Sequence, residues 1–543
     1  MRPTIEIFME PYNRPLRQLE AALEAKGKLR EFAYVACGVY SAVYKAFDMR
    51  LRQHVAVKVV PSAGEGSVPF VPCLALRELR AMTSIRHPNV IAAREVFFTA
   101  ELTAFCFPLY HCSLAACLRA YGYMEEDMLR TIGREVASGL AAAHAAGIMH
   151  RDIKPANILM KHQDVVVADW GLARDLRDPA PGEMSAEVIT LWYAPYEVAC
   201  GQQYTHAADV WSLGMTFIEM LGGCNMFGPK HMTRETFVLD MFMILGTADF
   251  TASERVWLDS VIPPTLPRMD TVATYPNTLV AAMDTCAVSP ELRSLLTGML
   301  AVEPGARLSM EEVCAHVFFA NAGFKERPAS TVEVRPALGA HSRKRSLTEE
   351  IPAVTSIALA AALPVTPRFK HRWNYGPCTE AEVLLLTAAA FDALGEYGFR
   401  ALAMAAHTSW QVAVLRPGTL LACVSLAHAV LGPLYNGRRQ LYAALRRRVC
   451  GVTSPEQLFA LEMDVLQQLD GVFPQVPAAD WVAYEAMPVG GVGQQLGAHL
   501  WCLAEVDPDT ILGMCAEYQA GGPRSAALVA ALLALDKKEY VSM

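Results

Sequence analysis

Hydrophobic and polar positions change their spacing along the chain, and the changes divide it into segments of different structure. Leu16, Leu19 and Leu23 recur at helical spacing near the amino terminus and predict a short amphipathic helix. From Phe32 the apolar residues alternate with polar ones and many are β-branched, which predicts strands. Residues 327–369 are rich in Pro, Ala, Ser and Thr without sustained periodicity, so we expect a linker there.

A region rich in alanine and leucine follows Pro377. Its apolar segments have the length of helices, and breaks separate them at Gly398, Pro417-Gly418, Pro433, Gly451 and Pro474. This pattern predicts an all-helical domain. A chain of 543 residues is too long for one typical domain and is expected to hold about three or four domain-sized units.

Composition narrows the environment and the partners. The net charge of −8 argues against a nucleic-acid partner. The 14 cysteines are scattered, with no CxxC motif and no Cys/His cluster at metal-ligand spacing, so we expect free thiols in a reducing compartment. Neither a signal peptide nor an apolar run of roughly 18 residues is present. We therefore expect no membrane partner and an intracellular protein, in the nucleus, the cytoplasm or both.

The motif with the clearest chemistry is HRDIKPAN, residues 150–157, followed by the triplet Asp169-Trp170-Gly171. Transfer of a phosphoryl group demands positioning and charge neutralisation more than covalent chemistry, and an aspartate, a lysine, an asparagine and a second aspartate in this order supply both. A buried polar turn in an unrelated α/β protein is the alternative, but the pattern is long and specific. The segment resembles the catalytic loop of eukaryotic-type protein kinases.

This resemblance implies a role for each of these side chains. Asp152 would orient and deprotonate the acceptor hydroxyl, and Lys154 would meet the γ-phosphate of ATP. Asn157 and Asp169 would hold the Mg²⁺ ion that neutralises the β- and γ-phosphate oxygens.

The resemblance also implies an ATP site in the predicted strands. Residues 35–43, VACGVYSAV, lie where kinases have a glycine-rich phosphate loop, but Ala36 and Ser41 replace two of its three glycines and leave only Gly38. Side chains at these positions hinder the approach of the backbone to the phosphates. A pseudokinase scaffold that binds partners without phosphoryl transfer is therefore the alternative function.

Further motifs complete the nucleotide site. Val55-Ala56-Val57-Lys58 matches the strand whose lysine grips the α- and β-phosphates, and Glu78 is the candidate partner that orients this lysine. Phe107 falls at the gatekeeper position, before a hinge at residues 108–110. The implied ATP contacts are Val35, Ala36, Gly38, Val43, Ala56, Lys58, Glu78, Phe107 and Leu159.

Residues 71–78, VPCLALRE, resemble the VPSTAIRE helix of cyclin-dependent kinases position by position. A cyclin docks on that helix, so the resemblance implies that Leu74 and Leu76 belong to a cyclin-type interface. Taken alone, the segment also fits an ordinary amphipathic core helix.

Three arginines resemble the set that gathers one activation-loop phosphate in active cyclin-dependent kinases: Arg77, Arg151 and Arg174. Cations that converge without an anion would repel one another, so the trio implies a negative partner. Ser185 falls at the phosphorylated position, with a solvated loop serine as the alternative. Tyr40 matches the inhibitory tyrosine of the phosphate loop, but valine replaces the threonine before it.

The segment after the activation loop bears on specificity and on the core of the lobe. Ala194 stands where the family has an arginine that shapes the pocket for a proline after the target residue, so we expect only a weak preference for proline there. Glu197 should pair with Arg307, and residues 209–214 resemble the helix that braces the catalytic loop. The lobe should end near Phe319.

The helical domain resembles the first half of a cyclin box, most clearly in residues 454–471, SPEQLFALEMDVLQQLDG. Glu462 matches the acidic residue with which a cyclin contacts its kinase. The usual lysine partner of this residue should lie near Leu431, but the domain has no lysine there, and Arg438 and Arg439 are candidate substitutes. A generic helical bundle is the alternative.

Together the resemblances imply a bilobal α+β protein kinase fold, with a small β-rich N-lobe and a helical C-lobe, followed by an all-α cyclin-box-like domain. The expected order is an extension over 1–31, a kinase domain over 32–320, a linker over 321–370 and the helical domain over 371–543. The implied activity is transfer of phosphate from ATP, with Mg²⁺, to serine or threonine of protein substrates, promoted by phosphorylation near Ser185. The implied activating partner is the chain's own cyclin-like domain in cis or a separate cyclin.

Overall fold

The computed structural model describes most of the chain up to Ala320 and shorter parts of the remainder. The described residues are 13–38, 40–62, 71–162, 164–177, 190–222, 234–263, 268–270, 272–285, 288–320, 355–358, 404–405, 417–431, 454–469, 471 and 473. The expectations for Ser185, Arg438 and Arg439 lie outside these residues.

An antiparallel sheet forms the small lobe. Its strands β1 (Leu29–Cys37), β2 (Ala42–Asp48), β3 (Gln53–Pro61), β4 (Glu95–Phe98) and β5 (Leu102–Pro108) lie in the order β1-β2-β3-β5-β4. Because successive side chains of a strand point to opposite faces, the alternation that predicted strands gives this sheet two different faces. Ala42 and Val57 are buried on one face, whereas Val43 and Ala56 are only half-buried on the other.

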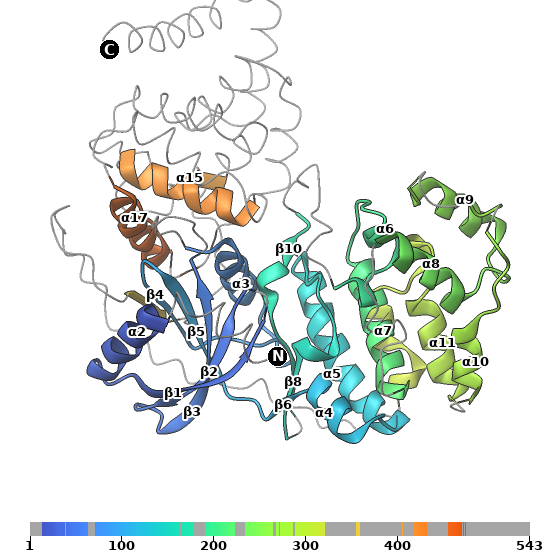
Figure 1. The fold of residues 1–543 in the computed structure, drawn as a ribbon, viewed down its shortest axis with the longest axis horizontal. Coiled ribbons are helices and arrows are strands. Elements are labelled where there is room, and N and C mark those ends of the chain that lie inside the picture. The colour runs from blue at the N-terminus through green and yellow to red at the C-terminus, as the bar shows by residue number, and fades with distance from the viewer. Residues whose placement is uncertain are drawn as a thin grey trace, which may run out of the picture.

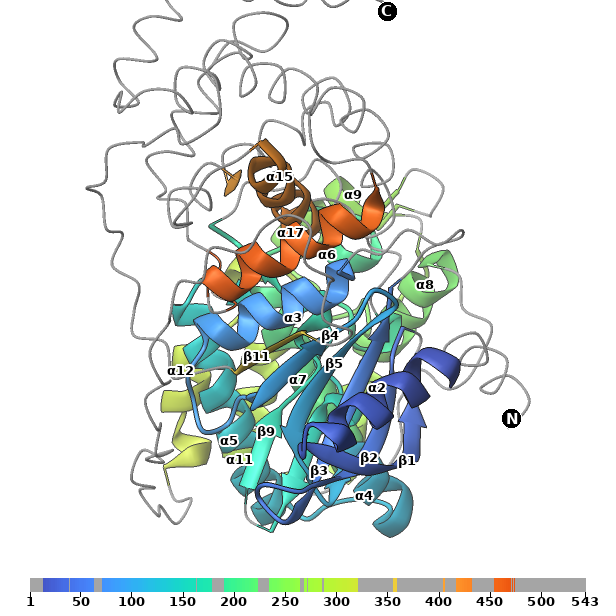
Figure 2. The same cartoon turned by 90° about the vertical axis from the view of Figure 1, so that its left-hand side faces the viewer.

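Helix α2 (Asn13–Ala25) covers the buried face of this sheet (Figures 1 and 2). The three leucines that predicted a helix here are buried in one cluster with Val55 and Val57, so the prediction of an amphipathic helix is confirmed. The carboxylate of Glu20 accepts the backbone N–H of Phe32 at 3.0 Å, which ties the helix to β1.

Strand β11 (Thr355–Ala358) extends the sheet beyond β4. It runs antiparallel to β4, with Thr355 opposite Phe98 and Ala358 opposite Glu95. This corrects the expectation of an unstructured linker for these four residues. The sequence TSIA is uncharged and half β-branched, which suits a strand, but four residues are too few for periodicity to separate a strand from a loop.

Helices form the large lobe (Figure 1). They are α4 (Leu114–Tyr121), α5 (Glu126–Ala145), α6 (Tyr196–Ala199), α7 (Ala207–Gly222), α8 (Arg234–Leu245), α9 (Ala252–Val261), α10 (Thr278–Thr285), α11 (Pro290–Met299) and α12 (Met310–Ala315), with 3₁₀ turns at Leu191–Tyr193, Pro304–Ala306 and Val317–Phe319. Helices α5 and α7 cross closely, because a Cβ atom on Gly133 would lie 2.6 Å from the ring of Phe217. This crossing fixes α7 beneath the segment that follows α5.

Short strands position the segment that follows α5. Strands β6 (Cys112–Ser113), β8 (Ile158–Lys161) and β9 (Asp164–Val167) form one small sheet, and β7 (Ile148–Met149) pairs with β10 (Arg174–Asp175) in another. The HRDIKPAN motif connects β7 to β8 and contains the 3₁₀ turn Pro155–Asn157, and the Asp-Trp-Gly triplet follows β9 in the turn Trp170–Leu172. The two motifs therefore meet, because the strands that flank them are paired.

Two helices from the carboxy-terminal region lie against the side of the small lobe that carries helix α3 (Figures 1 and 2). The two helices are α15 (Pro417–Leu431) and α17 (Pro455–Gln468), and α3 spans Cys73–Ser84. Helix α15 contacts both α17 and α3, and all its side chains from Leu421 to Leu431 are buried.

Helix α17 coincides with the helix predicted from residues 454–471. The side chain of Ser454 caps its first turn by accepting the N–H of Gln457, and Gly471 follows its end with a φ of +72°. The predicted all-helical region is therefore helical at α15 and α17. Most of its other predicted helices lie outside the described residues.

Two compositional features concern described residues directly. The described cysteines carry free thiols, and they are Cys37, Cys73, Cys106, Cys112, Cys117, Cys200, Cys314 and Cys423. Among the helices that the structure describes, none combines the length and the apolar character needed to cross a bilayer.

We expect that α2 stabilises the small lobe. Leu19→Ala should lower the free energy of unfolding by about 2 to 5 kcal/mol, because a fully buried leucine would be replaced by a cavity. Gln18→Ala on the exposed face of the same helix is the control, and its effect should stay within about 0.5 kcal/mol. Urea unfolding measures both, and equal stability of the two variants would contradict the role of α2.

Candidate active site

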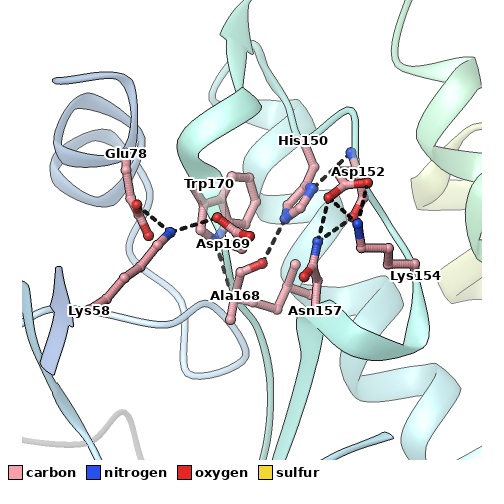
Figure 3. A network of polar contacts seen from close by, with 10 residues as sticks. Lys58, Glu78, His150, Asp152, Lys154, Asn157, Ala168, Asp169 and Trp170 are labelled. Carbon is pink, nitrogen blue, oxygen red and sulfur yellow. Dashed lines mark hydrogen bonds and ion pairs between the residues drawn. The ribbon is translucent and has the colours of Figure 1, made fainter. Parts of the chain in front are cut away.

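Three charged side chains from different elements meet where the sheet adjoins the large lobe (Figure 3). Lys58 lies in β3, Glu78 in α3 and Asp169 after β9. The Nζ of Lys58 donates to Oε2 of Glu78 at 2.7 Å and to Oδ1 of Asp169 at 2.6 Å. The side chain of Glu78 is 1% exposed, whereas that of Asp169 is 48% exposed. The expected ion pair between β3 and α3 is thus present, and it requires α3 to lie close to the sheet.

The proton equilibria of this trio follow from burial and charge. Burial alone would lower the pKa of Lys58, but the carboxylates of Asp169 and Glu78 outweigh burial and raise it. Burial raises the pKa of Glu78, and Lys58 only partly offsets this effect. Burial would also raise the pKa of Asp169, but Lys58 outweighs it and lowers that pKa. As the pH falls, Glu78 therefore takes up a proton before Asp169 does.

Asp152 lies at the centre of a second polar group (Figure 3). Its carboxylate accepts from Nζ of Lys154 at 2.7 Å, from the hydroxyl of Thr190 at 2.8 Å and from Nδ2 of Asn157 at 2.9 Å. Asn157 also donates to the backbone carbonyl of Asp152 at 2.8 Å. The structure thus brings together the side chains that the sequence assigned to catalysis and metal binding, and it leaves the amide oxygen of Asn157 directed away from Asp152.

Asp209, at the start of α7, fixes the backbone of the catalytic loop. Its carboxylate accepts the backbone N–H groups of His150 and Arg151, each at 2.8 Å, and Nε2–H of His144 at 3.0 Å. Burial alone would raise the pKa of Asp209, but these donors lower it, so the carboxylate stays ionised. Arg151 has a φ of +74°, which is costly for a residue other than glycine, and the contacts to Asp209 hold it there.

Trp170 holds the turn that carries Asp169. Its side chain is fully buried, and its indole N–H donates to the carbonyl of Val167 at 3.1 Å. Its ring lies edge-on to that of His150, with 4.5 Å between ring centroids, and His150 donates from Nε2 to the carbonyl of Ala168 at 3.0 Å. These contacts fix both sides of Asp169, whose φ is +67°.

The predicted adenine contacts lie on neighbouring elements. Ala56 in β3 is opposite Phe107 in β5, and Phe107 is buried, as a gatekeeper position requires. Val43 in β2 is opposite Lys58 and half-buried, and Leu159 in β8 is half-buried as well. The structure thus places Val43, Ala56 and Phe107 on the same strand as the lysine that would hold the phosphates or on strands paired with its strand, and Leu159 lies in the sheet of β6, β8 and β9.

The phosphate loop keeps a closed hairpin although two glycines are replaced. The N–H of Gly38 donates to the carbonyl of Ser41 at 2.8 Å, and Ala36 lies opposite Val43. A Cβ atom on Gly38 would meet the Ser41 hydroxyl at 3.7 Å, an ordinary contact, so the hairpin does not depend on glycine at this position. Val35 is 54% exposed, and Ala36 is exposed as well.

Two of the three predicted phosphate-binding arginines contact the end of α15. Nε of Arg77 donates to the carbonyl of Val430 at 3.2 Å. A terminal nitrogen of Arg174 donates to the carbonyl of Leu431 at 2.8 Å and to that of Val430 at 3.4 Å. The last carbonyls of a helix lack partners within the helix and carry the negative end of its dipole, so they are suitable acceptors for these cations.

The third arginine, Arg151, donates from Nε to the hydroxyl of Tyr204 at 2.6 Å. Burial lowers the pKa of Arg77 to about 10, with smaller contributions from the positive charges of Arg151 and Arg80. Ser185, the residue predicted to bring a phosphate here, lies outside the described residues.

The remaining expectations fall on described residues of the large lobe and the phosphate loop. Arg307 forms the expected pair with Glu197, with two parallel contacts of 2.5 and 2.9 Å in the core. Ala194 is buried beside Tyr204, where the family has its specificity arginine. Tyr40 is half-buried in the phosphate loop.

The residues assigned to a cyclin-type interface lie in or near the contact between α3 and α15. Leu76 is fully buried in α3, while the Cβ of Leu74 lies beside Gly171 of the Asp-Trp-Gly triplet. Glu462 is fully buried in α17 rather than exposed on a separate surface. The described helices of the carboxy-terminal region therefore adjoin the helix on which a cyclin would dock.

The sequence reading missed two features of this site. Thr190 contacts both Asp152 and Lys154, but the sequence motifs assigned it no role. The carbonyls of α15 could not be found at all, because a backbone acceptor has no sequence signature. For Thr190, its position between the activation loop and the following turn was the only sequence feature that could have indicated a place near the catalytic residues.

With this geometry established, comparison with known proteins defines the class. A family model described as a protein kinase domain matches residues 32–319, more than half of the chain. The chain belongs to the protein kinase family.

Individual relatives narrow the class further. Cyclin-dependent kinase 15 of Homo sapiens is 31% identical over 287 residues, which cover 52% of this chain and 63% of the relative. Cyclin-dependent kinase 15 of Mus musculus is 30% identical over 291 residues, covering 52% and 64%. Cell division control protein 2 homolog 1 of Trypanosoma brucei brucei is 28% identical over 293 residues, covering 52% and 94%. The kinase domain is thus similar to cyclin-dependent kinases, although the match spans less than two thirds of the first two.

We expect the Lys58–Glu78 pair to set the acid limit of activity. The pair requires an ionised Glu78, and because burial raises the pKa of this group, activity should fall with decreasing pH before an ordinary glutamate would titrate. Glu78→Gln should lower kcat/KM for ATP and remove this acid limb from the pH profile, whereas Glu101→Gln, at an exposed position, should retain it. An unchanged acid limb in Glu78→Gln would assign the titration to another group.

Proposed function

We propose that this protein is an ATP-dependent serine/threonine protein kinase of the cyclin-dependent type. The observation that supports this most is the double contact of Lys58 with Glu78 and Asp169. A lysine held between these carboxylates is fixed for contact with the α- and β-phosphates of ATP. Preorganised charge of this kind accounts for most of what phosphoryl transfer requires from the protein.

In the proposed reaction, Asp152 positions the hydroxyl of the substrate and accepts its proton. The substrate oxygen forms a bond to the γ-phosphorus as the bond from that phosphorus to the departing ADP oxygen breaks. Lys154 and Thr190 hold the Asp152 carboxylate in one orientation, and Lys154 would neutralise charge on the transferred group.

The oxygen atoms of Asn157 and Asp169 suit Mg²⁺. This cation prefers oxygen ligands and is usually held by one or two protein groups together with substrate phosphates. The amide nitrogen of Asn157 is directed at Asp152, and half-exposed Asp169 uses one oxygen for Lys58 and keeps the second. Bound there, Mg²⁺ would neutralise the β- and γ-phosphate oxygens.

A pseudokinase scaffold is the second candidate, and the phosphate loop favours it. Ala36 and Ser41 occupy glycine positions, and their side chains limit how closely a phosphate can approach the backbone. Against this candidate, Lys58, Glu78, Asp152, Asn157 and Asp169 are all retained, and the contacts of Lys58 and Asp152 are those that phosphoryl transfer requires. The loop also keeps its hairpin despite these replacements.

Asp152→Asn tests the enzymatic function. The substitution keeps the shape of the side chain but removes the base, so phosphate transfer to protein substrates should fall about 10²- to 10⁴-fold with little change in ATP affinity. Asp249→Asn, at an exposed position, is the matched control and should have full activity. Transfer of radiolabelled phosphate and binding of a fluorescent ATP analogue provide the two measurements. Equal rates for Asp152→Asn and the control would leave the scaffold function.

We further propose that the carboxy-terminal helices activate the kinase in cis. Helix α15 packs on α3, and α3 is the element that must lie against the sheet for Glu78 to reach Lys58. Arg77, in α3, and Arg174, after the Asp-Trp-Gly triplet, both donate to the end of α15. One helix end therefore links the two segments that move in kinase activation.

Phosphorylation near Ser185 remains part of this proposal. Helix carbonyls carry only partial negative charge, roughly half of an elementary charge at a helix end. Arg77, Arg151 and Arg174 bring three full positive charges, and the charges of Arg151 and Arg80 add to the larger effect of burial in lowering the pKa of Arg77. A phosphate would supply the additional negative charge.

Covalent connection makes an incomplete interface sufficient. Linking two binding modules on one chain gives effective concentrations of up to about millimolar. An interface without the lysine expected near Leu431 would then stay occupied, although the same contact between separate proteins would be weaker.

Val430→Lys tests the cis contact in the full chain. Val430 lines a small cavity with Arg77, Arg80 and Arg174, so an added cation should repel α15 from α3. Kinase activity should fall about tenfold or more. Gln467→Lys adds the same charge at an exposed position of α17 and should have normal activity.

Removal of residues 371–543 should lower activity in the same way as Val430→Lys. Binding of an ATP analogue and thermal unfolding of the kinase domain would show that the domain remains folded in each variant. Full activity of both Val430→Lys and the shortened chain would exclude activation in cis.

A further inference from the structure

Strand β4 would form the edge of the small-lobe sheet if β11 were absent. In the described sheet, β4 pairs with β5 on one side and with β11 on the other. Its four residues, Glu95 to Phe98, are all buried, and the strand contains neither Lys nor Pro. Edge strands that remain free usually carry such residues or a bulge, because an open row of backbone N–H and C=O groups promotes pairing with other chains. The edge of β4 is therefore suited to bind an extended segment.

We propose that the edge of β4 is a docking site for an extended segment and that residues 355–358 are its ligand in cis, where they anchor the carboxy-terminal helices to the small lobe. The inference deepens the proposed activation in cis and rests on it. The site would take a short, uncharged, β-branched segment, because the backbone supplies the bonds and TSIA brings no charge into this apolar edge.

The position of β11 in the sequence supports an anchoring role. The strand lies between the end of the large lobe at Ala320 and the start of α15 at Pro417, so the chain must pass the small lobe before it reaches α15. By pairing with β4, the chain is fixed at a point on the same lobe as α3. The segment that connects α15 to the small lobe therefore begins at β11 rather than at the end of the large lobe, and this shorter connection raises the effective concentration of α15 at α3.

The packing of β11 points the same way. Strand β11 contacts α17, α17 contacts α15, and α15 contacts α3 (Figure 2). The carboxy-terminal helices are thus held to the small lobe at two places, the edge of β4 and the surface of α3. A body held at two points on one lobe moves with that lobe, so α15 stays on α3 when the two lobes change their relative position.

The one carboxylate in β4, that of Glu95, is paired with cations. Glu95 lies opposite Ala358, and its carboxylate forms ion pairs with Lys28 and with Arg50. Lys28 follows α2, so the helix that covers the sheet also brings a cation to this edge. The docking edge therefore presents no unpaired carboxylate to an uncharged segment.

The direction in which each backbone N–H of β11 points decides which substitution tests this proposal. Thr99 donates its N–H to the carbonyl of Leu102, and backbone groups of alternate residues in a strand face opposite neighbours. Phe97 therefore faces β5 as Thr99 does, while Val96 faces β11. Ile357, opposite Val96, faces β4 in return.

Ile357→Pro in the full chain removes the N–H that faces β4. Ser356→Pro, one residue earlier, removes an N–H that faces away and is the matched control, because proline is tolerated on the outer side of an edge strand. Hydrogen exchange should become faster in peptides that cover β4 and α15 in Ile357→Pro, and kinase activity should fall about tenfold. Ser356→Pro should resemble the unchanged protein in all three readouts.

Each alternative outcome decides a separate point. Unchanged exchange at β4 in Ile357→Pro would show that the strand pairing is absent in solution and would overturn the proposal. Faster exchange at β4 with unchanged protection of α15 would also overturn it, because pairing would then not anchor the helices. Loss of protection at both places with full activity would support the anchor and would instead refute activation in cis.

Discussion

The ion pair between Lys58 and Glu78 is the interaction on which the rest of the structure depends. A carboxylate that is 1% exposed is costly to keep ionised, and its burial raises its pKa, so the pair persists only while α3 is pressed against the sheet. The sheet supplies one side of this arrangement. The other side of α3 is covered by α15, so the position of one buried carboxylate connects the proposed catalytic site to the carboxy-terminal helices.

A few buried contacts also hold the catalytic loop in place. Asp209 accepts two consecutive backbone N–H groups and the ring of His144, while Trp170 and His150 fix the turn around Asp169. Two residues there adopt left-handed backbone conformations that cost energy outside such a framework. The large lobe thus stores strain at the positions that must stay fixed, and the close crossing of α5 and α7 supports it from below.

Backbone groups form many of the contacts between the carboxy-terminal region and the kinase domain. The arginines of α3 and of the activation segment bind carbonyls at the end of α15, and β11 adds to the sheet through its backbone. Contacts of this kind depend on where a helix ends and on which strand edge is open. They explain how an interface can persist although the lysine expected near Leu431 is missing.

The sequence by itself determined the elements whose signals are local. The helical spacing of three leucines predicted α2, and HRDIKPAN with Asp-Trp-Gly predicted which side chains meet around Asp152 and Asp169, because the required residues lie close together in the chain. Only the tertiary structure decided the contribution of Thr190, the strand at residues 355–358 and the carbonyls that bind Arg77 and Arg174. A single hydroxyl, a four-residue strand and a backbone acceptor leave no pattern in a sequence, since their partners are chosen by packing across long separations along the chain.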